Sequence, residues 1–217
     1  MNISAKAFLF DLNGTIIDDM NYHADAWFDI LNNDLQANLS KEEVKLQMYG
    51  KNEELLIRIF GKGFFSRHRI NELSIEKERR YQTSYLPKLA LLDGLQQFLE
   101  ASKKANIPMA IGSAAIPFNI DFVLDNLQLR RFFPVVISAD DVSISKPHPD
   151  TFLKCAEALG IAPKDCIVFE DVPKGVESAL NAGMQTFVLT TTHPEADFAS
   201  FSNVIGFGKN YEDLVIG

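Results

Sequence analysis

Reactive side chains stand at four places in this sequence where a buried strand would end. The aromatic run Ala7–Phe10 stops abruptly at Asp11, and the polar turn Asn13-Gly14-Thr15 follows. An apolar run of this length is typical of a buried parallel strand, and ligands bind at the carboxyl ends of such strands. The other three places carry Ser113, Lys146 and the pair Glu170-Asp171.

Together these residue types indicate phosphoryl transfer. A carboxylate such as Asp11 can attack phosphorus or bind a metal ion. The hydroxyl of Ser113 and the ammonium of Lys146 can hold phosphate oxygens while negative charge redistributes. Acids from two strands repel each other unless a cation lies between them, and hard carboxylate oxygens beside a phosphate favour Mg²⁺. The sequence has no cluster of Cys and His residues that would indicate a zinc site.

Each of these residues also has a purely structural interpretation. Asp11 can begin a turn, and Ser113 can form a turn or cap a helix. Lys146 can be a solvated surface charge, while Glu170 and Asp171 can cap the helix that follows them. We favour the functional interpretation because all four places follow predicted strands.

The rest of the chain separates into a helical segment and an alternating segment. Residues 18–84 are predicted to be wholly helical, with helices at 22–32, 40–48, 53–60 and 66–86. Strands and helices alternate after about residue 90, which predicts an α/β fold with a doubly wound, Rossmann-like parallel sheet. The predicted domains are an α/β core from residues 1–17 and 85–217 and an inserted all-helical cap from residues 18–84.

The core elements can be placed more closely from their apolar patterns. The expected strands after the first are 107–111, 135–138, 166–169, 186–189 and 203–205. The expected helices are 95–104, 117–127, 149–159, 173–182 and a last one over 211–215.

Composition limits the classes of function. The chain has 217 residues, 47% of them hydrophobic, and a net charge of −8, so a nucleic-acid partner is disfavoured. No apolar run approaches the roughly 20 residues of a membrane span, and no signal-peptide leader is evident. We therefore expect a cytoplasmic monomer without a membrane partner. Cys155 and Cys166 are expected to be buried thiols and not a disulfide.

The ordered motifs of the chain resemble those of the haloacid dehalogenase superfamily, and in particular its β-phosphoglucomutase-like branch. The matching segments are Asp11-Leu-Asn-Gly-Thr15, Gly112-Ser113, Lys146-Pro147 and Phe169-Glu170-Asp171. The stretches 145–152 and 170–184 resemble that branch closely, and the helical insertion resembles its cap. The resemblance extends over about residues 5–190.

This resemblance implies a phosphoryl-transfer enzyme in which Asp11 becomes an aspartyl-phosphate. Asp11 and Asp171 would bind Mg²⁺ together with the backbone carbonyl of Asn13, and Glu170 would support the metal directly or through water. Lys146 would contact the transferring phosphate. Further residues implied for the phosphate or substrate site are Gly14, Thr15, Ser113, Ala114, His23, Gly50 and Lys51. His23 can equally be a packed or hinge residue, and Lys51 a surface lysine at a helix end.

Asn13 departs from the family pattern. Family phosphatases and mutases usually carry Asp there, as general acid to the leaving oxygen and then as general base. A carboxamide cannot shuttle a proton at neutral pH, and such help is typically worth about 10²–10⁴-fold. Three interpretations follow: a natural variant with slow or altered chemistry, a substrate whose leaving group needs no proton, or an introduced substitution.

A second departure concerns the substrate. Tyr49 stands before Gly50 where the family's mutases have a basic residue, and Glu53 stands where another is expected. We therefore predict an Mg²⁺-dependent phosphatase acting on a small phosphorylated metabolite such as a sugar phosphate. One alternative is a β-phosphoglucomutase-type sugar-phosphate mutase. Another is a phosphate-binding protein of this fold whose turnover is impaired by Asn13.

Overall fold

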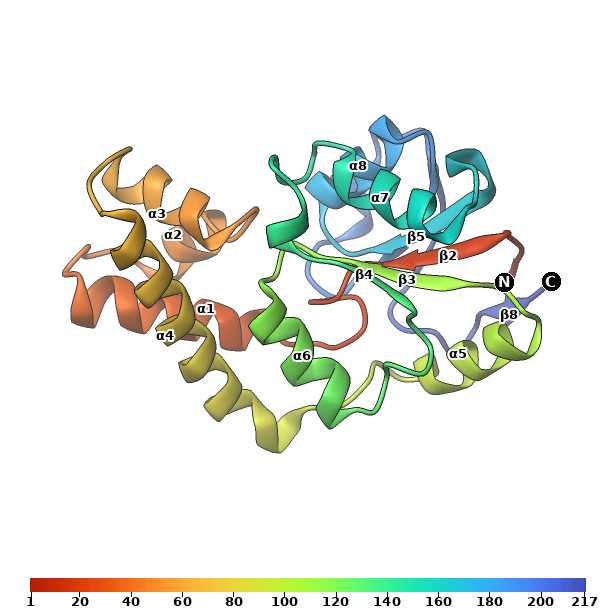
Figure 1. Ribbon diagram of the computed structural model, residues 1–217, viewed down its shortest axis with the longest axis horizontal. Coiled ribbons are helices and arrows are strands. Elements are labelled where there is room, and N and C mark those ends of the chain that lie inside the picture. Colours follow the sequence, from red (N-terminus) through yellow and green to blue (C-terminus); the bar gives the residue numbers. More distant parts are fainter. The chain divides into compact units, whose positions relative to one another are not determined.

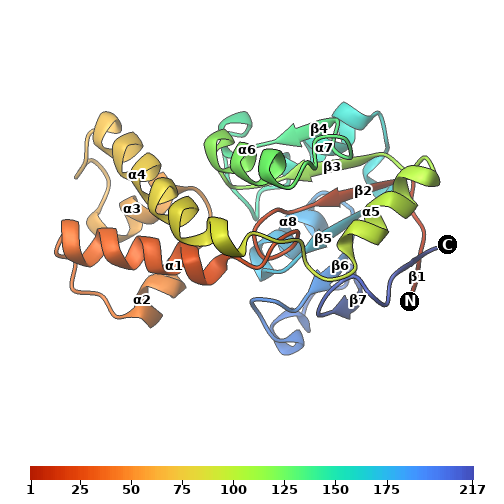
Figure 2. The same cartoon turned by 90° about the horizontal axis from the view of Figure 1, so that it is seen from below.

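Six parallel strands form the central sheet of the structure, a computed structural model that describes all residues from Met1 to Gly217 (Figure 1). The strand order is β4-β3-β2-β5-β6-β7, and every neighbouring pair is parallel, as Figure 2 shows from below. The strands are β2 (Ala7–Phe10), β3 (Met109–Gly112), β4 (Val135–Ile137), β5 (Cys166–Glu170), β6 (Gln185–Leu189) and β7 (Val204–Gly208). The predicted fold class is confirmed.

Helices cover both faces of this sheet. The helices α7 (Asp150–Leu159) and α8 (Pro173–Asn181) lie on one face, and α5 (Leu95–Lys104) and α6 (Pro117–Asn126) lie on the other (Figure 1). Every residue of β2 and β5 is buried as a result. This double burial explains why both strands are continuous apolar runs without the alternation of a half-exposed strand.

Aromatic rings join the two central strands below their carboxyl ends. Phe10 of β2 stacks on Phe169 of β5 with ring centroids 4.7 Å apart and an interplanar angle of 10°. Phe98 and Tyr211 contact Phe169 at 5.3 and 5.4 Å. Aromatic pairs of this kind contribute about 0.5–1.5 kcal/mol each beyond their buried area. The residues that follow Phe10 and Phe169 are therefore attached to well-packed strand ends.

The end of the chain differs from the prediction. The expected helix over 211–215 is wrong: a turn leads into β8 (Val215–Ile216), which pairs in parallel with β1 (Asn2–Ile3). Tyr211 is buried in the core, and its hydroxyl donates to the carbonyl of Thr15 (3.1 Å). This tertiary anchor fixes a segment too short to form a stable helix.

Two other boundaries also moved. The strand expected from residue 107 begins at Met109, because Pro108 has no N–H to contribute to a ladder. The strand expected over 203–205 continues to Gly208. Cys155 and Cys166 are both buried and free, as expected.

Residues 19–89 form a second compact unit, separate from the unit of residues 1–18 and 90–217. It contains only helices: α1 (Met20–Asp29) with a π-helical turn over Ile30–Asp34, α2 (Lys41–Leu46), α3 (Asn52–Phe60) and α4 (Arg67–Tyr85). The unit ends later than the predicted insertion because Leu86–Lys88 continues α4 as a 3-10 turn. No helix of the chain has both the length and the apolar character needed to cross a bilayer.

A buried polar cluster crosses the interior of the helical unit. The cluster consists of Asp19, His23, Lys77, Glu78 and Tyr81, all less than 6% exposed. His23 Nε2 lies 3.1 Å from Asp19 Oδ2, which also accepts from the Tyr81 hydroxyl at 2.6 Å. Lys77 Nζ lies 2.6 Å from His23 Nδ1 and donates to Glu78 Oε1 at 3.0 Å. These contacts give His23 a structural role inside the unit, while its predicted contact with substrate stays a prediction.

Replacing Glu78 with Leu should destabilise the helical unit by about 3–5 kcal/mol, since a buried ammonium then loses its carboxylate. Burial raises the pKa of Glu78, but Lys77 and His23 outweigh it and the net pKa is lowered, so the ionised form is favoured. Trp27, the only tryptophan, is buried in this unit, so its fluorescence during urea unfolding reports on it selectively.

The matched control for this variant is Glu72→Gln on the same helix. Glu72 is exposed and pairs with Arg69 at 3.3 Å, so its loss should change the unfolding free energy by less than about 1 kcal/mol. Equal urea midpoints for the Glu78 and Glu72 variants would contradict the structural role of the cluster.

Candidate active site

Strand register brings the predicted acids together. Phe10 of β2 is opposite Ile111 of β3 on one side and Phe169 of β5 on the other. Asp11 therefore lies one step beyond the sheet core, between Gly112 and Glu170, and its N–H donates to the carbonyl of Phe169 (3.0 Å). The carboxyl edge of a parallel sheet is the usual place for a ligand in this class of fold.

Lys146 joins Asp11 to Glu170. Its Nζ donates to Asp11 Oδ1 at 2.6 Å and to Glu170 Oε1 at 2.8 Å, and the side chain is buried. Lys146 was predicted to follow a strand directly. It lies instead in the loop between β4 and α7. Its ammonium reaches the sheet edge across the ring of Phe152, 4.5 Å from the centroid. A buried lysine with two carboxylate partners is not the solvated surface charge of the structural interpretation.

Glu170 is held by backbone and by a close helix. Its Oε2 accepts from the N–H groups of Asp171 (2.8 Å) and Val172 (2.9 Å). A Cβ atom on Gly175 in α8 would lie 1.6 Å from Glu170 Oε1, so only glycine allows α8 to approach this carboxylate. One oxygen of Glu170 is thus committed to the chain and the other to Lys146.

Asp171 is fixed by hydroxyl groups from two loops. Thr15 donates to its Oδ1 at 3.1 Å, and Thr192, after β6, donates to its Oδ2 at 2.6 Å. Gly14 has a positive φ of 79°, and a Cβ there would lie 2.2 Å from Asp171 Oδ2. The turn after Asp11 can therefore approach Asp171 closely only because residue 14 is glycine.

Burial shifts the pKa values of the acids at this edge of the sheet. Burial raises the pKa of Asp11 to about 7, against the lowering influence of Lys146 and with a further rise from Glu170. Burial also raises the pKa of Asp171 well above its usual range, and Glu170 and Asp11 add to that rise. Lys146 keeps its charge, because burial lowers its pKa but Asp11 and Glu170 raise it more. Lys146 pairs with only two of these three carboxylates, and a further cation would relieve their repulsion.

These residues fit a magnesium ion by their chemistry. The structure contains no group of three or more His, Cys, Asp or Glu side chains arranged to hold a metal. Mg²⁺ does not require one, because it commonly takes one or two carboxylates and keeps several waters. Asp11, Asp171 and the backbone carbonyl of Asn13 offer hard oxygen donors, and a cation beside Asp11 and Asp171 would offset the burial that raises the pKa of both acids.

The remaining predicted residues lie in different parts of the chain. Ser113 follows β3, is buried, and its hydroxyl accepts from the N–H of Ala115 (3.1 Å), while Ala114 beside it is half-buried. Asn13 is half-buried in the turn after Asp11. Gly50 and Lys51 precede α3 in the helical unit, where the Lys51 N–H donates to Glu54 Oε2 at 3.0 Å. Their predicted contacts with substrate stay predictions.

Sequence reasoning missed three residues that shape this group: Thr192, Gly175 and Phe152. Thr192 stands in a run of three threonines directly after β6, so its place at a strand end was a usable signal. Gly175 and Phe152 act through close packing between a helix and the sheet edge. That packing depends on the tertiary structure and leaves no local pattern.

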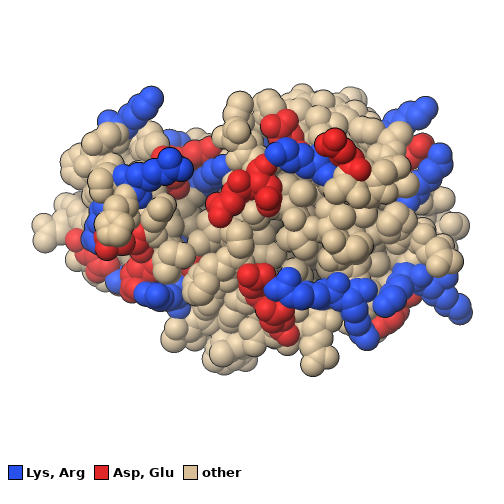
Figure 3. Space-filling view, in the orientation of Figure 1, with Lys and Arg blue, Asp and Glu red and all other residues tan.

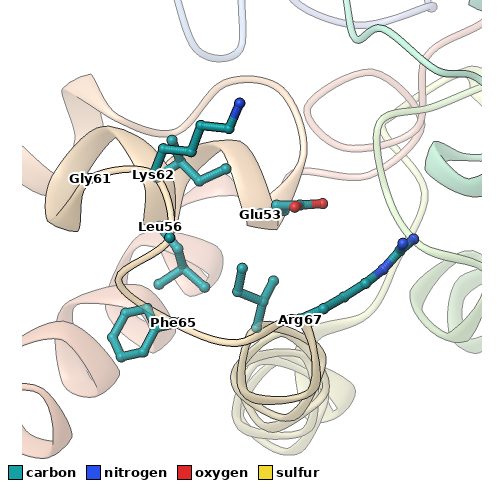
Figure 4. A pocket seen from close by; sticks show the side chains of 9 residues that line it. Glu53, Leu56, Gly61, Lys62, Phe65 and Arg67 are labelled. Carbon is teal, nitrogen blue, oxygen red and sulfur yellow. The ribbon is translucent and has the colours of Figure 1, made fainter.

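A cavity of about 450 Å³ lies within the helical unit, apart from Gly50 and Lys51. Figure 4 shows Leu56 and Phe65 along its apolar side, with Glu53 and Arg67 at its rim.

On the molecular face in Figure 3, acidic and basic side chains are interspersed, and neither sign forms a continuous field.

Acids and a buried lysine at the carboxyl edge of a parallel sheet define an α/β enzyme of Rossmann-like architecture. The family model for haloacid dehalogenase-like hydrolases matches residues 5–183, so the chain belongs to that family. A crystal structure of a family IA, variant 3 hydrolase from Entamoeba histolytica is similar to it with a TM-score of 0.86 and 30% identity. That likeness covers 100% of this chain and 96% of the other.

Two relatives indicate which kind of enzyme within this family the chain resembles. Fructose-1-phosphate phosphatase YqaB of Escherichia coli is 30% identical over 181 residues, covering 81% of this chain and 92% of the relative. β-Phosphoglucomutase of Bacillus subtilis is 33% identical over 185 residues, covering 82% and 80%. The chain is therefore a phosphatase- or phosphoglucomutase-like enzyme, and the predicted resemblance to this family is confirmed.

Proposed function

We propose that the chain is an Mg²⁺-dependent phosphatase that transfers a phosphoryl group from a small phosphorylated metabolite to Asp11 and then to water. The observation that carries this proposal is the contact of Lys146 with both Asp11 and Glu170 at the sheet edge. Residues 1–18 and 90–217 would be the catalytic domain, and residues 19–89 its cap. We infer that the protein acts as a cytoplasmic monomer.

Asp11 would act as the nucleophile. One of its carboxylate oxygens forms a bond to phosphorus while the bond from phosphorus to the substrate oxygen breaks with its electron pair. Lys146 already holds Asp11 Oδ1, so the carboxylate is oriented before substrate arrives. The ammonium would also stabilise charge on the phosphoryl oxygens, and the Ser113 hydroxyl together with the backbone around Ala114, Gly14 and Thr15 would bind those oxygens. Water then cleaves the aspartyl-phosphate.

Mg²⁺, when bound, would neutralise phosphate charge next to the nucleophile. Asp11, Asp171 and the Asn13 carbonyl would hold it, with Glu170 behind them. Asn13 would offer the leaving oxygen an amide hydrogen bond but no transferable proton. We infer that the chain as it stands turns over slowly on substrates with a basic leaving oxygen.

A phosphorylated sugar or sugar alcohol is the substrate class we infer, since relatives include fructose-1-phosphate phosphatase and hexitol phosphatase A of Escherichia coli. A sugar-phosphate mutase is the second candidate, favoured by the relative β-phosphoglucomutase. Tyr49 and Glu53 beside Gly50 and Lys51 argue for the phosphatase, because neither adds a cation for a second phosphate.

A substrate panel tests the proposal. The chain is incubated with Mg²⁺ and hexose 1-phosphates, hexose 6-phosphates or hexitol phosphates, and released phosphate is measured. A parallel assay follows conversion of β-glucose 1-phosphate to glucose 6-phosphate, which a mutase performs without phosphate release. Phosphate release that stops with a chelator and returns with Mg²⁺ supports the phosphatase. Isomerisation alone supports the mutase, and neither activity in any variant described below contradicts both.

Magnesium affinity should fall as the pH falls. With the pKa of Asp11 raised to about 7, the metal-free enzyme is mostly protonated there at pH 6 and mostly ionised at pH 8. Mg²⁺ must displace that proton, so its dissociation constant should be at least about tenfold larger at pH 6 than at pH 8. Isothermal titration calorimetry at both pH values measures this. Equal dissociation constants would exclude Asp11 as a proton-competing ligand, and an Asp11→Asn variant should have a smaller pH dependence that reflects Asp171 alone.

A further inference from the structure

The segment after β6 contacts both halves of the proposed metal site. Thr191 Oγ1 donates to the carbonyl of Gly14 at 2.5 Å, within the turn that carries Asn13. Thr192 Oγ1 lies 2.6 Å from Asp171 Oδ2. Two consecutive residues therefore tie the turn after β2 to the carboxylate after β5, although β6 itself pairs with β5 and not with β2.

The Thr192 hydroxyl has one hydrogen and three polar neighbours. They are Asp171 Oδ2 at 2.6 Å, the Asp171 backbone carbonyl at 2.9 Å and His193 Nδ1 at 2.9 Å. The contact with Oδ2 is the shortest, and in the metal-binding form, in which Asp171 is ionised, a hydrogen bond to its carboxylate is about twice as strong as a neutral one. The hydrogen therefore goes to Oδ2, and the Thr192 oxygen stays able to accept from His193.

Thr15 completes the restraint on the same carboxylate. It donates to Asp171 Oδ1 at 3.1 Å, so each carboxylate oxygen of Asp171 accepts one hydrogen bond from a threonine hydroxyl. Two donors on opposite oxygens fix the plane of a carboxylate, and each oxygen retains a lone pair. Asp171 is buried, so water does not replace a lost donor easily.

We propose that Thr192 is a positioning residue for the metal: it orients Asp171 as a ligand for Mg²⁺, while its neighbour Thr191 holds the turn that presents the Asn13 carbonyl. This inference rests on the proposed function. Groups that hold a metal ligand from behind typically contribute about 10–100-fold to metal affinity.

The test compares Thr192→Val, Thr192→Ser and the control Thr190→Val. Valine keeps the shape of threonine without the hydroxyl, and serine restores the donor. Thr190 is on the same segment, but its hydroxyl contacts only the Gly208 carbonyl at 3.4 Å. Mg²⁺ binding is measured by isothermal titration calorimetry at pH 8, and thermal unfolding without metal shows whether each variant is folded.

Thr192→Val should weaken Mg²⁺ binding about tenfold or more, while Thr192→Ser and Thr190→Val should stay within about twofold of the parent. In an Asn13→Asp background, Thr192→Val should raise the Mg²⁺ concentration for half-maximal rate and leave kcat at saturating Mg²⁺ nearly unchanged. A Thr192→Val variant that is folded and binds Mg²⁺ as the parent does overturns the inference alone. A parent that binds no Mg²⁺ overturns the inference and the proposed metal dependence together.

Discussion

Replacing Asn13 with Asp should raise the rate of phosphate release from alkyl phosphates by about 10²–10⁴-fold. Residue 13 lies two positions beyond Asp11, half-buried in the turn at the sheet edge. A carboxylic acid there can protonate the leaving alkoxide and then deprotonate the attacking water. The amide of Asn13 can do neither, while its backbone carbonyl is the same in both chains. The measurement is kcat for each chain at saturating Mg²⁺ and sugar phosphate.

The nature of the leaving group supplies the control for this prediction. An activated aryl phosphate expels a phenolate that is stable without a proton, so the gain from Asn13→Asp on the first chemical step should be much smaller than for an alkyl phosphate. An Asn13→Ala variant, which also lacks a proton donor, should be no faster than the parent. If the chain with Asn13 hydrolyses a particular alkyl phosphate as fast as the Asp variant does, general acid catalysis at this position is not needed for that substrate.

Most of the fold could be predicted from the sequence because the apolar pattern of its buried strands differs clearly from that of its helices. The apolar runs Ala7–Phe10 in β2 and Cys166–Phe169 in β5 are short and are followed by acids, which favours buried strands, and α5 occupies Leu95–Lys104 as expected. The C-terminal helix failed for a tertiary reason, since the burial of Tyr211 against Thr15 determines that segment more strongly than its local pattern.

The candidate site was predictable to the extent that it depends on strand ends. Asp11, Glu170 and Asp171 are adjacent because parallel strands end at one edge, which a sequence reveals. Lys146 reaches the edge from a loop, through packing on Phe152 that no pattern encodes. The contacts within the helical unit could not be predicted for a related reason: no local pattern distinguishes Lys77 and Glu78 from the other charged residues of α4, yet both are buried.

Replacing Asp11 with Asn should abolish turnover, with a fall of at least about 10³-fold in kcat even in the active Asn13→Asp background. The amide is nearly isosteric but a far weaker nucleophile, so no bond to phosphorus forms. Mg²⁺ affinity should fall as well, because one ligand carboxylate is lost. Lys146 keeps its contact with Glu170 at 2.8 Å, so the variant should remain folded, and this separates lost chemistry from lost structure.

Mass spectrometry of quenched reactions makes the assignment specific. During turnover of an activated aryl phosphate, whose leaving group needs no proton, the parent chain with Asn13 should carry one added phosphoryl group on the peptide that contains Asp11, because a missing general base slows hydrolysis of the aspartyl-phosphate. The Asp11→Asn variant should carry none. Asp165→Asn is the matched control, since Asp165 pairs only with the exposed Lys6 at 2.9 Å and should leave rate and labelling unchanged. Because both surface and site variants remove one aspartate, a loss confined to Asp11→Asn reflects the position of the carboxylate at the sheet edge. Unchanged activity in Asp11→Asn would remove the nucleophile from the proposal and with it the aspartyl-phosphate mechanism.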